Sequence, residues 1–85
     1  MNILITGVAG FIGSKLAKSL LKNRNNKVIG VDNLDNYYSL KLKNFRLKIL
    51  KKKKNFKFYK VDLKNIHNLN KINKIKRIDI IYHFA

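Results

Sequence analysis

The chain has 85 residues and a formal net charge of +16, with 20 Lys plus Arg against 4 acidic residues. Such a charge ordinarily suggests that a protein binds nucleic acid or an anionic membrane. Lys, Asn and Ile share AT-rich codons and are all abundant, however, so we attribute much of the charge to genome composition. We therefore expect no specific nucleic-acid partner and no membrane partner. The chain contains no cysteine and no clustered histidines, which argues against disulfides and a metal site. Residues 1–20 lack a secretion signal, and no run of about 18 apolar residues occurs, so we expect a cytoplasmic protein.

A glycine-rich turn follows the first predicted strand. The mainly apolar residues 2–6 are typical of a strand and are followed by Gly7, Gly10 and Gly13. The first glycine can take the tight turn that leaves the strand, and the second lets the main chain approach a phosphate without a Cβ in the way. The third lets the following helix lie close to the strand. This order of strand, glycines and helix indicates a site for the pyrophosphate of a dinucleotide.

The helix predicted over residues 11–23 begins with Phe11 and Ile12. Its unpaired N-terminal N–H groups would face the phosphates. Ile12, Leu16 and Leu20 recur at helical spacing and form one apolar stripe, which supports the prediction of a helix. We therefore expect the glycine-rich turn and the start of this helix to act together in binding phosphate.

The second predicted strand, residues 27–32, ends in the carboxylate of Asp32, which lies 19 residues beyond Gly13. Dinucleotide-binding folds place an acidic residue on the adenosine ribose at this point. The carboxylate would accept hydrogen bonds from the ribose hydroxyls and would repel a 2′-phosphate, which favours NAD over NADP. The alternative is that Asp32 only terminates the strand and that the glycines only form a turn.

A second helix is predicted over residues 39–53. Leu42, Phe45 and Ile49 form an i, i+3, i+7 stripe that we expect to pack on the neighbouring strands. Parts of the segment alternate with a period of two, as a strand would, but its length and its lack of Gly and Pro favour a helix. The remaining elements are predicted to be a strand over residues 56–61, a helix over residues 65–75 and a strand over residues 79–84.

This alternation predicts an α/β fold, a doubly wound parallel sheet of the Rossmann type with helices on both faces and strand order 3-2-1-4. The cofactor crevice is expected where the first and fourth strands diverge. Residues 79–84 form an apolar strand whose outer edge no later element covers. We therefore expect residues 1–85 to be the N-terminal part of a NAD(P)-binding Rossmann domain, truncated after its fourth strand and without a substrate domain.

Residues 6–13 resemble the T-G-x-x-G-x-x-G element of the extended short-chain dehydrogenase/reductases, the group that contains NAD-dependent sugar-nucleotide epimerases and dehydratases. Residues 32–38 are similar to the segment after the second strand in nucleotide-sugar 4-epimerases, most of all those of the UDP-glucuronate 4-epimerase type. The resemblance covers residues 3–85. We interpret the stretch after Asp32 as a loop over the adenosine ribose in which Asn33 and Asn36 supply polar contacts.

Two further segments resemble cofactor contacts of the same family. Asp62 and Leu63 are similar to the Asp-hydrophobic pair at the end of the third strand, which flanks the adenine. His83, Phe84 and Ala85 resemble the opening of the H-[FL]-A-[AG] element, which lies along the nicotinamide side of the cofactor. The resemblance therefore implies that Asp62, Leu63, Phe84 and Ala85 contact NAD.

Tyr37 and Lys41 match the Y-x-x-x-K spacing by which this family places a tyrosine base beside a lysine. In the family that pair lies well after the fourth strand, on the helix that follows a catalytic Ser or Thr. Tyr37 and Lys41 follow the second strand instead, at the adenosine end of the cofactor. We therefore assign them no catalytic role.

The resemblance implies the NAD-binding portion of a nucleotide-sugar epimerase or dehydratase. The complete enzyme would oxidise a sugar hydroxyl by hydride transfer to tightly held NAD and later return the hydride. The family's catalytic residues and its nucleotide-sugar subdomain do not match any part of the chain, so we expect no catalysis from the 85 residues alone and a nucleotide-sugar partner only for a complete enzyme. Two alternatives remain open: a self-contained dinucleotide-binding module without catalysis, and a small basic protein associated with nucleic acid.

Overall fold

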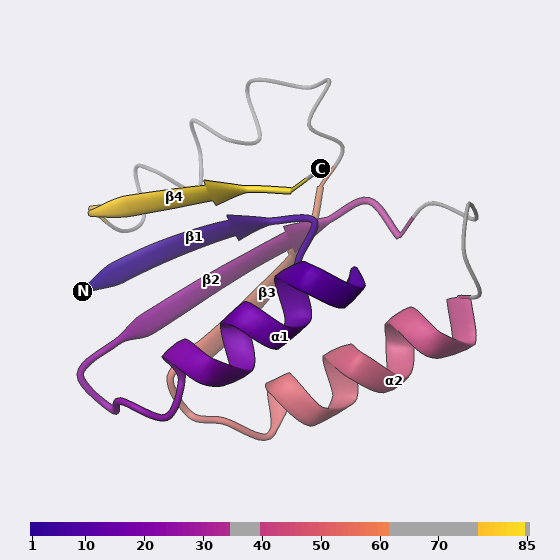
Figure 1. Cartoon of the computed structure of the whole chain (residues 1–85), viewed down its shortest axis with the longest axis horizontal. Helices are drawn as coiled ribbons and strands as arrows, with labels where there is room; N and C mark the ends of the chain where they lie inside the picture. Colours follow the sequence, from indigo (N-terminus) through magenta and orange to yellow (C-terminus); the bar gives the residue numbers. More distant parts are fainter. Residues whose placement is uncertain (35–39, 62–76, 85) are drawn as a thin grey trace.

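The computed structural model describes residues 1–34, 40–61 and 77–84 of the chain. The elements in chain order are β1 (Asn2–Thr6), α1 (Phe11–Leu20), β2 (Lys27–Asp32), α2 (Leu40–Lys51), β3 (Phe56–Lys60) and β4 (Ile80–His83). In this part of the chain, four strands form a parallel sheet in the order β3-β2-β1-β4 (Figure 1). The predicted α/β class and the strand order 3-2-1-4 are confirmed.

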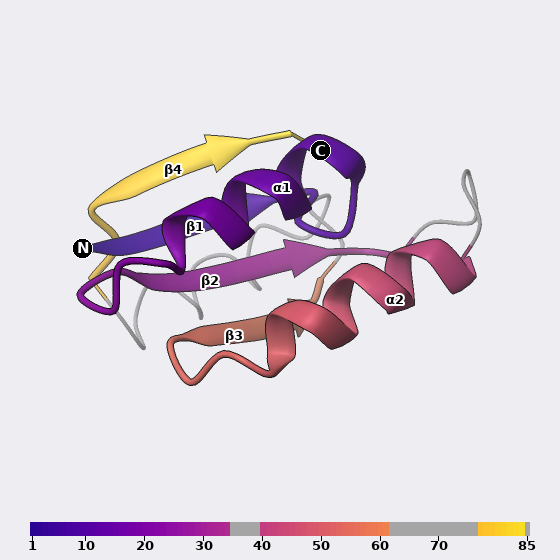
Figure 2. The ribbon, with the colours of Figure 1, turned by 60° about the horizontal axis from the view of Figure 1, so that its bottom comes forward.

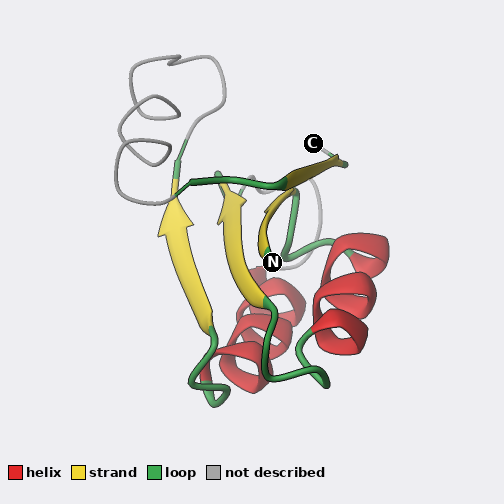
Figure 3. Ribbon diagram, turned by 90° about the vertical axis from the view of Figure 1, so that its left-hand side faces the viewer, coloured by secondary structure: helices red, strands yellow, loops and turns green. Residues whose placement is uncertain are grey.

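The two described helices, α1 and α2, lie on the same face of the sheet (Figure 2). Side chains of β1 alternate between the faces, so Ile3 and Ile5 pack toward the helices whereas Leu4 packs with Ile29 and Val31 on the other face. Figure 3 shows the helices stacked against one side of the strands. Burial of both faces explains why β1 and β2 read as nearly continuous apolar runs. The helix predicted over residues 65–75 lies outside the described residues.

The helix α1 ends at Leu20, three residues before the end of the predicted span 11–23. Asn26 donates a side-chain hydrogen bond to the carbonyl oxygen of Leu20 at 3.1 Å, and the side chain of Asn23 accepts one from the N–H of Asn25 at 3.0 Å. Such local amide bonds compete with the helical pattern and stabilise a turn instead. The other described elements agree with their predicted bounds to within two residues.

The face that α2 buries is not the predicted one. Phe45 is 61% exposed and Leu42 is 45% exposed, so the stripe expected to pack on the strands is directed largely at solvent. The buried residues of the helix are Lys43, Leu47 and Leu50. These three positions also recur at helical spacing, and the prediction was wrong because it excluded a lysine from the core-facing side.

Candidate functional site

The turn after β1 is tied to the end of β2. The N–H groups of Gly7 and Val8 both donate to the carbonyl oxygen of Val31, at 2.9 and 3.2 Å, and the N–H of Gly10 donates to the carbonyl oxygen of Gly7 at 3.1 Å. Gly7 has a φ of 69°, in the left-handed region that favours glycine. This residue therefore makes the tight turn that leaves the strand.

Gly13 is the point at which α1 touches this turn. A Cβ placed on Gly13 would lie 2.3 Å from the carbonyl oxygen of Gly7 and 3.1 Å from the Cα of Val8, both of them backbone atoms. A Cβ on Gly10 would meet the same carbonyl oxygen at 3.2 Å, which is a much milder contact. Close helix packing thus requires glycine at position 13, whereas Gly10 is partly exposed beside the turn.

The N-terminus of α1 is open to solvent. Among the described residues, no side chain caps this helix end, and its first turn contains no acidic residue. Phe11 is 67% exposed and Ile12 is 63% exposed. Ile12 belongs to the same predicted helical stripe as Leu16, but only Leu16 packs against the core, whereas Ile12 lies exposed at the start of the helix. Uncapped helical N–H groups carry a partial positive charge and attract anions.

Asp32 lies at the end of β2 and is only 6% exposed. Its Oδ2 accepts the N–H of Ala9 at 3.0 Å, and its Oδ1 accepts the N–H of Leu34 at 2.9 Å. Each carboxylate oxygen can accept about two hydrogen bonds, so each keeps acceptor capacity for another donor. The carboxylate thus joins the glycine-rich turn to the chain segment that follows β2.

Two cationic side chains of α2 contact Asp32 and the glycine-rich turn. The Nζ of Lys43 lies 3.8 Å from Oδ1 of Asp32, and the Lys43 side chain is 9% exposed. The guanidinium of Arg46 donates to the carbonyl oxygen of Ala9 at 3.1 Å and lies 5.8 Å from the centre of the Phe11 ring. Sequence reasoning missed both residues. Their i, i+3 spacing is a signal, but it cannot stand out in a chain with 20 basic residues.

The carboxyl ends of β1 and β4 are joined by a side-chain contact. The hydroxyl oxygen of Thr6 lies 2.7 Å from Nδ1 of His83, and it accepts the N–H of Phe84 at 3.0 Å. The two strands neighbour each other, but the chain leaves β1 toward β2 on its other side. Doubly wound sheets form their ligand crevice at such a change of direction.

The structure brings most of the predicted site residues to one end of the sheet. Those it describes there are Gly7, Gly10, Phe11, Ile12, Gly13, Asp32, Asn33 and Phe84. The side chain of Asn33 is exposed and that of Phe84 is 44% exposed. Four other predicted site residues lie outside the described residues, namely Asn36, Asp62, Leu63 and Ala85. Lys41 is an exposed residue near the start of α2, and Tyr37, the other residue of the Y-x-x-x-K match, lies outside the described residues.

The family model for GDP-mannose 4,6 dehydratase matches residues 4–85 of the chain. The chain belongs to this family. It is 46% identical over 82 residues to UDP-glucuronate 4-epimerase from Thermodesulfobacterium geofontis, a match that covers 96% of this chain and 25% of the relative. The membership confirms the resemblance to sugar-nucleotide epimerases and dehydratases that the motifs indicated.

Solved structures of nucleotide-sugar epimerases and dehydratases agree with this family assignment. The UDP-glucuronic acid 4-epimerase of Bacillus cereus, in complex with UDP-glucuronic acid and NAD, matches all of this chain with a TM-score of 0.89 and 39% identity, over 26% of its own length. The dTDP-glucose 4,6-dehydratase of Bacillus anthracis, in complex with NAD, matches with a TM-score of 0.87 and 32% identity, also over 26% of its own length. The chain therefore spans about a quarter of the length of the relatives it matches, and it corresponds to their N-terminal Rossmann portion.

Neither a membrane helix nor a metal cluster is found in the part of the chain that the structure describes. No helix within residues 1–34, 40–61 and 77–84 has the length and apolar character needed to cross a bilayer. No group of three His, Cys, Asp or Glu residues in the same ranges lies close enough together to hold a metal ion.

Proposed function

We propose that this chain binds NAD at the carboxyl ends of β1, β2 and β4, as the dinucleotide-binding portion of a nucleotide-sugar epimerase or dehydratase. The observation that carries the proposal is the juxtaposition of an uncapped helix N-terminus with the buried carboxylate of Asp32. The hydrogen bond from the N–H of Ala9 to Asp32 holds these two features together at 3.0 Å. Relatives at 32–46% identity whose structures contain NAD or whose names specify sugar nucleotides support the same function.

In this proposal the pyrophosphate lies over the start of α1. The open surface beside Gly10 admits the phosphates, and Gly13 keeps the helix close enough for its first N–H groups to donate to them. Phe11 and Ile12 supply those N–H groups, and their exposed side chains form the rim. Arg46 fixes the turn through the carbonyl oxygen of Ala9. The phosphate contacts are therefore made by backbone that other elements hold in place.

The adenosine ribose then lies on Asp32, with Asn33 beside it. Both carboxylate oxygens already accept a backbone N–H, so they are fixed in position and can accept the ribose hydroxyls without reorganisation. A 2′-phosphate would meet a like charge at this position. Lys43 weakens the repulsion, because its ammonium lies 3.8 Å from the same carboxylate. We therefore expect a preference for NAD that is about tenfold, or about 1.4 kcal/mol.

The remaining predicted contacts complete the cofactor site. Asp62 and Leu63 are proposed to flank the adenine, Asn36 to contact the ribose, and Phe84 and Ala85 to lie along the nicotinamide side. NAD supplies the acceptance and return of a hydride in the complete enzyme, whose substrate we propose to be a nucleotide sugar. The residues of this chain bind and orient the cofactor, and we assign none of them a catalytic role.

Titration calorimetry with NAD, NADP and ADP-ribose at about 0.15 M salt tests the proposal, since that ionic strength screens the basic surface. NAD and ADP-ribose should bind with similar affinity, and NADP about tenfold more weakly. Asp32→Asn keeps the shape of the side chain and should reduce the difference between NAD and NADP. Equal or tighter binding of NADP by the unmodified chain would overturn the role of Asp32, and no binding of any of the three would overturn the site.

A further inference from the structure

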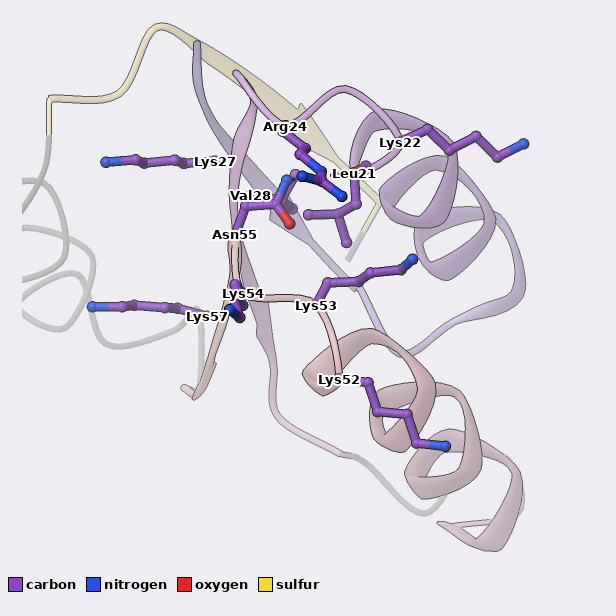
Figure 4. A pocket seen from close by; sticks show the side chains of 10 residues that line it. All are labelled: Leu21, Lys22, Arg24, Lys27, Val28, Lys52, Lys53, Lys54, Asn55 and Lys57. Atoms are coloured by element: carbon purple, nitrogen blue, oxygen red, sulfur yellow. Dashed lines mark hydrogen bonds between the residues drawn. The ribbon is translucent and has the colours of Figure 1, made fainter.

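A basic hollow lies at the opposite end of the sheet from the dinucleotide site. Figure 4 shows the side chains that line it. Its volume is about 860 Å³. Seven of its ten lining residues are cationic, namely Lys22, Arg24, Lys27, Lys52, Lys53, Lys54 and Lys57. The other three are Leu21, Val28 and Asn55. All four strands are parallel, so the loops that enter β2 and β3 meet at this amino end.

The hollow is built by two loops that one side chain ties together. The amide of Asn55 donates to the carbonyl oxygen of Asn26 at 2.8 Å and to that of Leu21 at 3.4 Å, which joins residues 52–55 to residues 21–26. The N–H of Val28 donates to the carbonyl oxygen of Asn55 at 2.9 Å. These contacts fix the backbone from which the cationic side chains project, so the placement of the cations around the hollow follows from the fold.

The positive charge of the hollow has no acidic partner among the described residues. Asp32 lies at the other end of the sheet beside Lys43, and Asp79 accepts the N–H of Asn2 at 2.7 Å. The N-terminal ammonium of Met1 bonds to the carbonyl oxygen of Asn25 at 3.0 Å and adds a further positive charge to one of the two loops. The C-terminal ends of α1 and α2 contribute only about half a negative charge each. A strong positive field therefore remains at this end of the molecule.

The lining selects among polyanions. Leu21 and Val28 are buried at 3% and 1% exposure, so the hollow offers no apolar side chain for insertion into a bilayer. None of the described residues that line it is aromatic, so bases would find no stacking platform among them. Figure 4 shows Lys27 and Lys57 extending on one side of the sheet end and Lys22 and Lys53 on the other, with Arg24 between them. Cations spread along a hollow in this way suit a row of phosphates.

We propose that this hollow binds a linear chain of phosphate groups without reading bases, as in the backbone of single-stranded nucleic acid or in inorganic polyphosphate. The strands that separate it from the glycine-rich turn are five and six residues long, which corresponds to roughly 15–20 Å. The phosphate chain and the dinucleotide therefore bind at separate sites and do not exclude one another.

Fluorescence anisotropy with a labelled single-stranded DNA of mixed sequence, measured between about 50 and 200 mM salt, tests the proposal. Replacing Arg24, Lys53 and Lys54 by Gln removes three lining cations, and replacing Lys18, Lys41 and Lys48 by Gln removes three exposed cations elsewhere. The two variants have the same net charge, three units below that of the unmodified chain, and circular dichroism checks that they remain folded. The hollow variant should bind at least about tenfold more weakly at about 0.1 M salt, and its salt slope should fall by about 2. The control should change by less than about threefold. Equal losses in both variants would overturn the hollow as the site.

Two competition experiments identify the ligand chemistry. Inorganic polyphosphate at equal phosphate concentration should displace the DNA, and failure to do so would contradict recognition of phosphates alone. A polyphosphate affinity above that of the DNA would identify polyphosphate as the ligand source, and the reverse would identify nucleic acid, with either result supporting the shared chemistry. Saturating NAD should leave the DNA affinity unchanged to within about twofold. Displacement by NAD would place the DNA in the dinucleotide site and would contradict the proposal without affecting the NAD assignment.

Discussion

Replacing Gly13 by Ala tests whether the approach of α1 to the glycine-rich turn holds this fold together. The added Cβ would lie 2.3 Å from the carbonyl oxygen of Gly7, 3.0 Å from its carbonyl carbon and 3.1 Å from the Cα of Val8. All three are backbone atoms and cannot rotate away. The turn itself cannot retreat easily, because the N–H groups of Gly7 and Val8 are bonded to the carbonyl oxygen of Val31.

The size of the effect follows from these distances. Ordinary van der Waals contact begins near 3.4 Å, so the first turn of α1 would have to withdraw by about 1 Å, and overpacking of this kind costs about 1–3 kcal/mol. Ala favours a helix over Gly by about 1 kcal/mol, which offsets part of the cost. Because only backbone can move, we expect a cost in the upper half of that range, which leaves a net loss of about 1–2 kcal/mol and a Tm lower by about 5–15 °C.

Thermal unfolding followed by far-ultraviolet circular dichroism at pH 7 measures this loss. Ser14→Ala is the matched control, because Ser14 is the next residue of the same helix and its hydroxyl bonds only to the exposed carbonyl oxygen of Phe11 at 3.2 Å. The control should stay within about 0.5 kcal/mol of the unmodified chain. A Gly13→Ala variant as stable as the control would refute the reasoning, since the helix would then move away from the turn at no cost.

Three further predictions concern the dinucleotide site. Gly10→Val should abolish NAD binding in calorimetry, because the branched side chain would occupy the surface proposed for the phosphates, whereas Lys41→Ala alters an exposed residue and should leave the affinity unchanged. The opposite result would mean that the crevice is misplaced. Lys43→Met should lower the free energy of unfolding by about 1–3 kcal/mol in urea titrations, since it leaves the buried carboxylate of Asp32 without its cation. An unchanged or higher stability would show that the ion pair contributes nothing to folding. Arg46→Ala should weaken NAD binding about tenfold by freeing the turn; full retention of affinity would indicate that the turn is rigid without it.

Much of the fold is encoded in short segments of the sequence. The apolar runs of β1 and β2, the glycines between β1 and α1, and the carboxylate at the end of β2 each depend on neighbours along the chain, so the class and the strand order could be predicted. The residue at which α1 ends was harder to predict, because it depends on hydrogen bonds that the side chains of Asn23 and Asn26 make locally. Several asparagines lie close together in this part of the chain, and the sequence alone does not say which of their side chains form these hydrogen bonds.

The orientation of α2 was decided by tertiary structure. Two overlapping stripes satisfy the helical period, and the apolar one, which contains Phe45, was the natural choice. The helix instead buries Lys43, because the carboxylate of Asp32 from a strand 11 residues earlier is placed to receive its charge. A buried cation is stable only beside such a partner, and no pattern along the chain reveals whether the partner is within reach.

By itself, the sequence identified the glycine-rich turn proposed to bind phosphate, the acidic residue proposed for the ribose and the family to which the chain belongs, since these depend on residue type at fixed short spacings. Only the tertiary structure showed that Lys43 and Arg46 of α2 contact Asp32 and Ala9, that Thr6 joins His83, and that the lysines of two loops line one hollow. These contacts join residues far apart in the chain. Their distances are fixed by the packing of helices on the sheet, which local spacing does not specify.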